Sequence, residues 1–355
     1  MLIGSRTSAE PILDPDLPIV DAHHHLWFQT AESIAAMEAH DSITARALAV
    51  TFRRHPRYLF DELLADLESG HNICATVHND AHAMYRASGP EEMKSVGEVE
   101  FVNGVAAMVA SGAFGSVKAC AAIVGGVNLQ LGSRVEDVLH AHIQAGGGRY
   151  RGVRTSALYD EDPSIFGANA GAPQLLLDPK FRNGYACLQR LGLSFDALVL
   201  EPQLPEVTDL AREFPEVPIV LNHLGCPVGV GRFAGKREER FPTWRENVRT
   251  LAQCENVTVK LGGLGTPFGG FKSVGSATPA TSQQLAIEWK PYIETCIESF
   301  GVNRCMFESN FPIDAAAGSY RAVWNAFKRV CATASKSEKE ALFSGTALRV
   351  YRLDA

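Results

Sequence analysis

Three histidines in the segment PIVDAHHHLW (18–27) are the strongest indication of chemistry in this chain. An apolar, β-prone run leads directly into Asp21, His23, His24 and His25. Because side chains alternate between the two faces of a strand, His23 and His25 project together and His24 points away. Two neutral imidazoles at one strand end offer lone pairs in fixed directions, which suits a divalent metal ion or a bound anion. A histidine-rich surface turn is the alternative interpretation.

Other strand-like segments end in groups that could contact a substrate. RYRGVRTS (149–156) carries Arg151 and Arg154, whose planar guanidinium groups bind carboxylates in a bidentate manner; a surface ion pair is the alternative for each. His223 follows the apolar run PIVL and precedes a glycine and a proline, which indicates the end of a buried strand. Lys260 lies inside an apolar run, where it could hold a substrate, act as a base with a lowered pKa or form a buried ion pair.

The last strand-like segment, RCMFESNFPID (304–314), carries carboxyl and amide groups. Glu308 and Asn310 lie two residues apart and therefore share one face of a strand, whereas Asp314 lies in the loop beyond it. A buried glutamate is rarely unpaired. If Glu308 faces the interior, it needs a metal ion, a lysine or a catalytic proton.

Strand-like and helix-like segments alternate along the chain, without a linker, a repeat or a low-complexity tract. This alternation indicates parallel strands joined by helical crossovers, and eight strands favour a closed (β/α)8 TIM barrel in a single domain over an open doubly wound sheet. The carboxyl ends of barrel strands form the active site, so the groups above should meet there. The predicted strands are 18–25, 72–79, 118–128, 149–156, 194–201, 218–224, 257–262 and 304–310. The predicted helices are 31–50, 59–69, 101–112, 133–145, 179–191, 205–213, 243–253, 282–300 and 319–332.

Some helix ends can be predicted from the residues alone. Asp178 before a proline is typical of an N-cap, Gly192 fits the position after a helix, and Ser337 with Glu340 forms a capping-box pattern before the last helix. The stretch 101–131 is poor in charge, but glycines and polar residues interrupt it. It therefore indicates a buried helix and a buried strand, not a membrane span.

The composition is that of an ordinary soluble globular protein. A formal net charge of −7 at pH 7 argues against a nucleic-acid or anionic-membrane partner, which needs a basic surface. Eight scattered cysteines without a CxxC pair indicate free thiols in a reducing compartment. The N-terminus lacks the apolar core of a secretory signal, so we expect a cytoplasmic protein. Residues 1–17 are interpreted as an N-terminal extension and 18–355 as the barrel.

The chain resembles the amidohydrolase superfamily, in particular the branch of TIM-barrel lactone hydrolases that includes 2-pyrone-4,6-dicarboxylate lactonase and the sugar lactonases. The segments that carry the resemblance occur in the family's order and span most of the chain: DAHHHLW (21–27), RGVR (151–154), EPQLPE (201–206), NHLGCP (222–227), KLGGLG (260–265) and FESNFPID (307–314).

The resemblance implies that His23 and His25 line the site, that His223 joins them, and that Arg151 and Arg154 hold an acidic or hydroxylated substrate. Such lactonases add water to an ester carbonyl within a ring, often without a tightly bound metal, whereas other amidohydrolases use one or two divalent ions. Operation with and without a metal both remain open.

Two positions depart from the family pattern. The family element usually reads GSDWP, with the aspartate activating water, whereas this chain reads ESNFP, and Asn310 cannot accept a proton. Glu308 could take over as base or metal ligand, or could form a buried pair with Lys260. Glu201 stands where relatives often have a histidine, so it could join His23, His25 and His223 in a nitrogen and oxygen set for zinc or manganese.

We therefore expect a hydrolase that opens a lactone of sugar or aromatic catabolism, with an anionic or polyhydroxylated small molecule as substrate. Glu308 or Asp314 would take the proton, Asn310 and His223 would line the reacting centre, and Gln203 would contact the substrate alongside Arg154 and Lys260. A decarboxylase or hydratase is the alternative reaction, and a barrel that lost catalysis and serves as a binding subunit is the alternative class. A homo-oligomer is left open.

Overall fold

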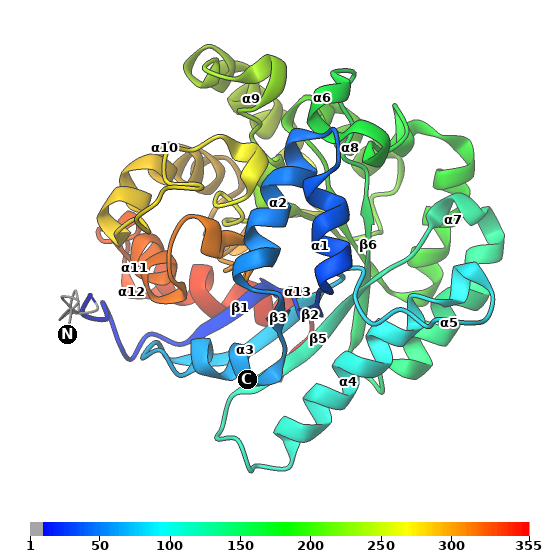
Figure 1. Ribbon diagram of the computed structural model, residues 1–355, viewed down its shortest axis with the longest axis horizontal. Helices are drawn as coiled ribbons and strands as arrows, with labels where there is room; N and C mark the ends of the chain where they lie inside the picture. Colours follow the sequence, from blue (N-terminus) through cyan, green and yellow to red (C-terminus); the bar gives the residue numbers. More distant parts are fainter. Residues whose placement is uncertain (1–9, 355) are drawn as a thin grey trace.

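The computed structural model describes residues 10–354; residues 1–9, which include half of the predicted N-terminal extension, lie outside the described part. Its centre is a sheet of eight parallel strands in the order β1-β4-β5-β6-β7-β8-β9-β10 (Figure 1). Neighbouring strands follow one another along the chain, as the alternation of segments predicts. The strands are β1 (Ile19–His24), β4 (Ile73–Asn79), β5 (Lys118–Gly126), β6 (Tyr150–Ser156), β7 (Ser194–Leu198), β8 (Ile219–Leu221), β9 (Val257–Lys260) and β10 (Cys305–Met306).

Backbone hydrogen bonds join the last strand segment to the first. The amide of Asn310 donates to the carbonyl of His23 at 2.9 Å, and the amide of His25 donates to the carbonyl of Phe311 at 2.8 Å. These bonds close the sheet beyond the carboxyl ends of β10 and β1. The prediction of a TIM barrel in place of an open sheet is confirmed.

Helices pack around the outside of this barrel (Figure 1). Two of them begin earlier than the sequence predicts, at Val96 and Arg237, because charged residues and a glycine or proline in their first turns resemble loop sequence. The principal helices are α3 (Phe60–Leu67), α4 (Val96–Ala110), α5 (Val135–Ala145), α7 (Pro179–Leu191), α8 (Leu204–Glu213), α9 (Arg237–Leu251), α10 (Ser282–Phe300) and α11 (Tyr320–Val330), with the short α6 (Pro163–Phe166), α12 (Lys336–Glu340) and α13 (Thr346–Val350).

The segment predicted as one helix at 31–50 forms two, α1 (Ala31–Glu38) and α2 (Ile43–Arg54). Ser42 begins the second, because its hydroxyl accepts the amide of Ala45. The short strand β2 (Trp27–Phe28) precedes these two helices and β3 (Arg57–Tyr58) follows them, and the two strands pair in an antiparallel ribbon. Thr44 donates to the carbonyl of Ile165 at 2.6 Å, which ties α2 to the loop that follows β6.

Helix ends agree with the sequence at one place and differ at another. Asp178 caps α7 by accepting the amide of Lys180, and Gly192 ends it in the left-handed conformation, as predicted. The capping box before the last helices is formed by Ser335 and Glu338, not by Ser337 and Glu340. The prediction was wrong by two residues because both serines precede a glutamate by three positions, and the sequence does not show which one stands outside the helix.

Small and branched side chains fill the barrel interior, among them Val20, Ala22, Val77 and Val220. From the amino-terminal end, Ala347 and the fully buried Tyr351 of the C-terminal segment close this core.

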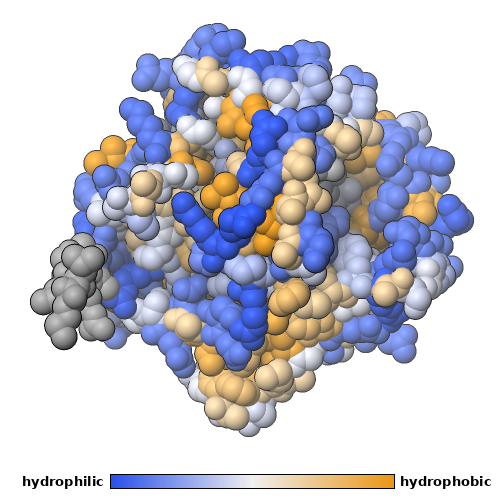
Figure 2. Space-filling model, in the orientation of Figure 1, coloured by the Kyte–Doolittle hydropathy of each residue, from blue (hydrophilic) through white to orange (hydrophobic). Residues whose placement is uncertain are grey.

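The charge-poor stretch 101–131 forms most of α4 and all of β5, as predicted. Within residues 10–354 no helix is long and apolar enough to cross a membrane. Figure 2 shows that polar residues cover most of one face, with an apolar area at its lower edge.

Candidate active site

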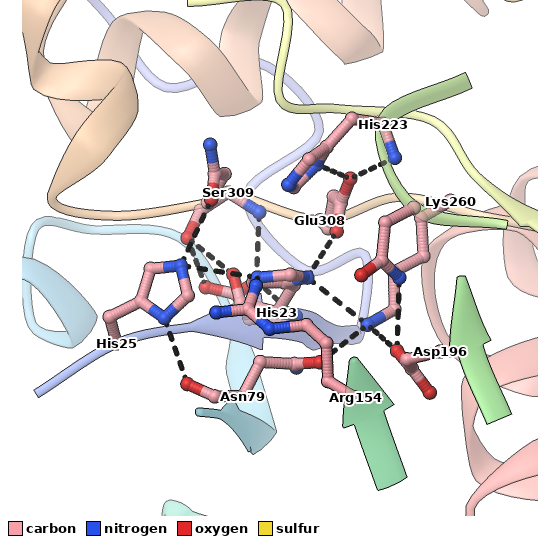
Figure 3. Close-up of polar contacts among 12 residues, drawn as sticks. His23, His25, Asn79, Arg154, Asp196, His223, Lys260, Glu308 and Ser309 are labelled. Carbon is pink, nitrogen blue, oxygen red and sulfur yellow. Dashed lines mark hydrogen bonds and ion pairs between the residues drawn. The ribbon is translucent and has the colours of Figure 1, made fainter. Parts of the chain in front are cut away.

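His23 and His25 lie side by side at the carboxyl end of β1, as their spacing predicts (Figure 3). The two Nε2 atoms are 3.2 Å apart. His24 occupies the other face of the strand, where its Nε2 lies 2.9 Å from the hydroxyl of Thr76. Strand alternation therefore creates the pair of converging imidazoles.

An oxygen atom lies close to Nδ1 of each of the two histidines. His25 Nδ1 lies 2.8 Å from the carbonyl oxygen of Asn79 and must carry its proton to donate there. His23 Nδ1 lies 2.9 Å from Oε2 of Glu308. Burial, together with the positive charges of Lys260 and Arg154, holds the pKa of His23 well below its usual value, and burial has the same effect on the pKa of His25. Both rings are neutral near pH 7, so each keeps one lone pair.

Glu308 links His23 to His223. Its Oε1 lies 2.6 Å from Nδ1 of His223, and the carboxylate is fully buried. The turn after β8 presents His223 to the site by giving this residue a positive φ of 54°. Gly262 and Gly263 of β9's following loop leave room, since a methyl group at either position would overlap Glu308 or His223. Glu308 therefore holds two imidazoles in fixed orientations.

Lys260 forms a buried ion pair, but with Asp196 and not with Glu308. Its Nζ lies 2.7 Å from Asp196 Oδ2, 3.2 Å from Asn79 Oδ1 and 3.2 Å from His23 Nδ1. Among the three roles that the sequence left open, the contacts favour the ion pair. Lys260 sits beneath His23, fully buried, and supports it from the barrel interior.

Arg154 reaches the same cluster from β6. Its NH1 lies 3.3 Å from Nε2 of His23, and its NH2 donates to the carbonyl oxygen of Asp80. Only 9% of the residue is exposed, and it also lines a hollow of about 630 Å³ with Tyr85 and Thr155. A guanidinium between a solvent-connected hollow and the histidines is placed to hold an anionic or carbonyl oxygen.

Asn310 and Asp314 form a pair at the edge of the cluster. Asn310 Nδ2 donates to Asp314 Oδ1 at 2.7 Å, so its Oδ1 faces Nε2 of His25 at 3.2 Å. Burial raises the pKa of Asp314 to about 8, although hydrogen bonds from Gly265 and Asn310 act in the opposite direction. Asp314 touches no histidine of the cluster and instead orients the amide of Asn310.

Several of these groups could hold a metal ion. Among the described residues, His23, His223 and Glu308 each offer one ligand atom within 4.8 Å of the others. On the opposite side of His23, the unprotonated Nε2 of His25 faces the amide oxygen of Asn310, which is also an acceptor. Two acceptors at 3.2 Å with no proton between them suit a cation, and neutral imidazoles with a carboxylate or carbonyl behind Nδ1 are the usual arrangement of metal-binding histidines.

Three residues predicted for the site, Arg151, Glu201 and Gln203, have other partners and form no hydrogen bond or ion pair with the histidine cluster among the described residues. Arg151 donates to the carbonyls of Tyr351 and Gly148 near the start of β6, because the strand carries it away from the carboxyl end. Glu201 is paired with Arg240 of α9 and contacts none of the histidines. Gln203 is occupied by backbone groups: its amide donates to Ala157 and accepts from Leu200 and Tyr159.

Three buried polar residues of the site were missed by the sequence analysis. Asp196 interrupts the apolar strand SFDAL, and Asn79 ends an apolar strand; both are signals that could have been used. Asp21 was noted only as part of the histidine segment. It joins β1 to the segment after β10 by accepting both the hydroxyl and the amide of Ser309, at 2.6 and 2.8 Å.

Comparison with known proteins shows the family to which the chain belongs. A sequence model of the amidohydrolase family matches residues 20–353. The uncharacterized protein y4mH of Sinorhizobium fredii is 34% identical over 339 residues, which are 95% of this chain and 99% of that protein. An L-fucono-1,5-lactonase of Burkholderia multivorans is 30% identical over 177 residues, which are 50% of this chain and 57% of that protein.

A solved structure supports the fold. An amidohydrolase from Burkholderia multivorans with bound zinc superposes with a TM-score of 0.69 at 23% sequence identity, and the match covers 95% of this chain and 99% of that chain. At this identity the likeness concerns the barrel. The family match over residues 20–353 shows more than the fold. The chain belongs to the amidohydrolase family and is an enzyme of the amidohydrolase superfamily with lactonase-like relatives.

Proposed function

We propose that this enzyme hydrolyses a lactone, with an anionic or hydroxylated substituent held by Arg154. The observation that carries the proposal is the cluster of three imidazoles, two of which face one buried carboxylate, with a guanidinium 3.3 Å from the nearest ring. A lactone needs a polarised carbonyl, a positioned water and a proton acceptor, and this set offers all three. The partial likeness to an L-fucono-1,5-lactonase supports the choice of a cyclic ester.

In the proposed reaction, His223 is the proton acceptor. Its Nδ1 faces Glu308 at 2.6 Å, so its Nε2 keeps the lone pair and has no hydrogen bond within residues 10–354. Nε2 takes a proton from water as the water oxygen attacks the ester carbon. The ring C–O bond then breaks, and the departing oxygen takes that proton back. Glu308 stabilises the imidazolium in between, as the carboxylate of a catalytic triad does.

This assignment changes the role expected of Glu308. Both of its oxygens face imidazole nitrogens, and it has no exposed surface from which to reach water. We therefore treat Glu308 as the group that orients His23 and His223. Asp314 lies behind Asn310 and is a positioning residue in this proposal.

A divalent ion fits the same cluster. Two sets of donors share His23. On the Nε2 side of its ring, His25 and Asn310 would complete the set. On the Nδ1 side, His223 and Glu308 would do so. The Nε2 side is favoured because the Nδ1 atoms of both histidines already have partners. Such an ion, zinc or manganese by its donors, supplies polarisation of the carbonyl. Arg154 competes for the same lone pair of His23, so the metal content should rise when its guanidinium is removed.

The test is a screen of purified protein against lactones, with acid release recorded by a pH indicator above the spontaneous rate. The panel contains L-fucono-1,5-lactone, other sugar lactones and 2-pyrone-4,6-dicarboxylate. Glu308→Gln should lower kcat at least about 100-fold, because loss of one catalytic partner costs on the order of 2.7 kcal/mol or more. Glu213→Gln on α8, where Glu213 forms a surface ion pair with Arg182 of α7, is the control.

Two other outcomes would replace the proposal. Release of carbon dioxide from aromatic carboxylic acids, without hydrolysis of any lactone, would assign a decarboxylase. A folded protein that binds a lactone without turning it over, and whose affinity is unchanged in Glu308→Gln, would be a binding subunit. Elemental analysis of wild type, His25→Ala and Arg154→Gln measures the metal independently of activity.

A further inference from the structure

The amino-terminal end of the barrel, opposite the histidine cluster, contains a cluster of basic residues. Four basic residues line a hollow of about 580 Å³ there, and we call it the basic hollow: Lys118 at the start of β5, Arg149 and Arg151 at the start of β6, and Arg352 after α13. The protein as a whole is acidic, with a formal net charge of −7. Four basic residues around one hollow are therefore a local excess of positive charge on an acidic protein.

The three arginines of the basic hollow donate only to neutral oxygens among the described residues. Arg149 NH1 donates to the side-chain oxygen of Asn103 at 2.7 Å, and Arg352 NH1 donates to the carbonyl of Gly192 at 2.9 Å. Arg151 donates through Nε and NH1 to backbone carbonyls, which leaves its NH2. Each guanidinium therefore keeps N–H groups for another acceptor, and none forms an ion pair in the described part of the chain.

The charges of the hollow are not balanced. Asp354 is the one acid among its lining residues. Burial, together with the nearby charges of Arg352 and Arg149, lowers the pKa of Arg151, while Asp354 acts in the opposite direction. Arginines that repel one another at the end of a barrel store electrostatic free energy that a bound anion would release.

The walls indicate the kind of anion. Gly147 and Gly148, both at positive φ, and Ser116 leave space beside the arginines, because no side chain longer than a hydroxymethyl group projects from them. The apolar lining residues include Val109, near the end of α4, and Val117, directly before β5. The connection between α4 and β5 lies at the bottom of Figure 1, where Figure 2 shows an apolar area. The hollow thus has a cationic side and an apolar side.

We propose that the basic hollow binds an organic phosphate, with its phosphoryl group on the arginines and its organic part on the apolar edge. Three guanidinium groups, two from residues 149–151 and one from the C-terminal segment, match the three terminal oxygens of a phosphoryl group, whereas a carboxylate offers two. The volume exceeds that of a phosphate ion, which leaves room for the organic part.

The basic hollow is separate from the candidate active site but connected to it. Arg151 precedes Arg154 by three residues in β6, which corresponds to about 10 Å along a strand. Arg151 Nε donates to the carbonyl of Tyr351 at 2.7 Å, and the hydroxyl of Tyr351 donates to Asp196 at 3.2 Å. Asp196 in turn holds Lys260 beneath His23. The ligand of the hollow would therefore sit against the same C-terminal segment that supports the histidine cluster.

Isothermal titration calorimetry with phenyl phosphate and benzoate, at constant ionic strength, tests the proposal. The two probes share an aromatic ring and differ in the anionic group. Phenyl phosphate should bind the wild type at least about tenfold more tightly than benzoate, a difference of on the order of 1.4 kcal/mol. Arg352→Gln and Arg149→Gln should each weaken phenyl phosphate binding by a similar factor, whereas Arg249→Gln, an exposed arginine on α9, should leave it unchanged.

Arg154→Gln separates this site from the active site. It should keep the affinity for phenyl phosphate, because Arg154 lines a different hollow. Loss of binding in Arg154→Gln together with normal binding in Arg352→Gln and Arg149→Gln would place the phosphate at the histidine cluster and overturn the proposal. Equal affinity for both probes, or no heat of binding for either with correctly folded protein, would overturn it as well.

Discussion

Gly263 lies against the imidazole of His223 so closely that a methyl group on its Cα would overlap Nδ1 and Cγ of the ring. Gly262, the residue before it, stands in the same relation to Glu308. At these two positions the loop after β9 therefore supplies space and no side chain. In that space Glu308 approaches His223 to 2.6 Å.

Gly263→Ala should lower kcat at least about tenfold, because the added methyl group displaces His223 and the backbone φ of 70° is unfavourable for alanine. Steady-state kinetics on the lactone found in the screen measures the change. Gly104→Ala, in the exposed interior of α4 with open space around its Cα, is the control and should keep full activity. Wild-type kcat in Gly263→Ala would show that the position of His223 does not limit the reaction.

Arg154→Lys should lower kcat/KM about tenfold or more, on the order of 1.4 kcal/mol. The guanidinium contacts His23 and the carbonyl of Asp80 with two different nitrogens, and a lysine has one. Measurement of kcat and KM for the wild type and for Arg154→Lys tests this prediction. Arg190→Lys, in an exposed ion pair with Glu136, controls for the loss of a guanidinium in general. Unchanged kcat/KM in Arg154→Lys would remove this residue from the substrate site.

The barrel and the strand-1 histidines could be predicted because both depend on local periodicity. Alternation along β1 places His23 with His25 whatever the rest of the chain does. The eight strands follow from apolar runs separated by helical segments, and neighbours in sequence become neighbours in the sheet.

The partners of the buried charges could not be predicted in this way. Lys260 pairs with Asp196 on β7 and not with Glu308, which lies closer to it in the sequence. Glu201 pairs with Arg240 of α9. Such pairs depend on which side chains meet across the barrel, and this is decided by strand tilt and side-chain length that residue spacing does not contain.

Stability should depend on pH through Asp66. Burial raises the pKa of Asp66 to about 6 in the folded protein, above its usual 3.8. The folded state thus holds this proton more tightly, so stability falls as pH rises from about 4 to 6. Asp66→Asn, which can still accept the hydroxyl of Tyr58, should raise Tm by about 2–4 °C at pH 7.5 and change it little at pH 4.5.

Thermal unfolding by circular dichroism at the two pH values checks this prediction. Asp61→Asn, at an exposed carboxylate in the same helix, should have a small effect at both. A gain in Tm of the same size at pH 4.5 and 7.5 would mean that the effect of Asp66→Asn does not come from ionisation.

Tyr351 should support catalysis from the far end of the barrel. Its buried hydroxyl donates to Asp196 at 3.2 Å, and Asp196 also accepts from Lys260 at 2.7 Å and from Asn222 at 3.0 Å. Without the hydroxyl, the carboxylate can rotate and Lys260 can shift beneath His23. Tyr351→Phe should therefore lower kcat about threefold to tenfold with little change in KM, since the substrate does not reach this residue.

The matched control is Tyr185→Phe, because the hydroxyl of Tyr185 is equally buried but has no hydrogen-bond partner in the described residues. Its removal should leave kcat unchanged and preserve or raise Tm. The two variants remove the same atom from two buried tyrosines, so a merely structural role for Tyr351 predicts lower Tm with normal kcat. A fall in kcat confined to Tyr351→Phe, measured where both variants are fully folded, would identify the chain from Tyr351 through Asp196 to Lys260 as part of what positions His23.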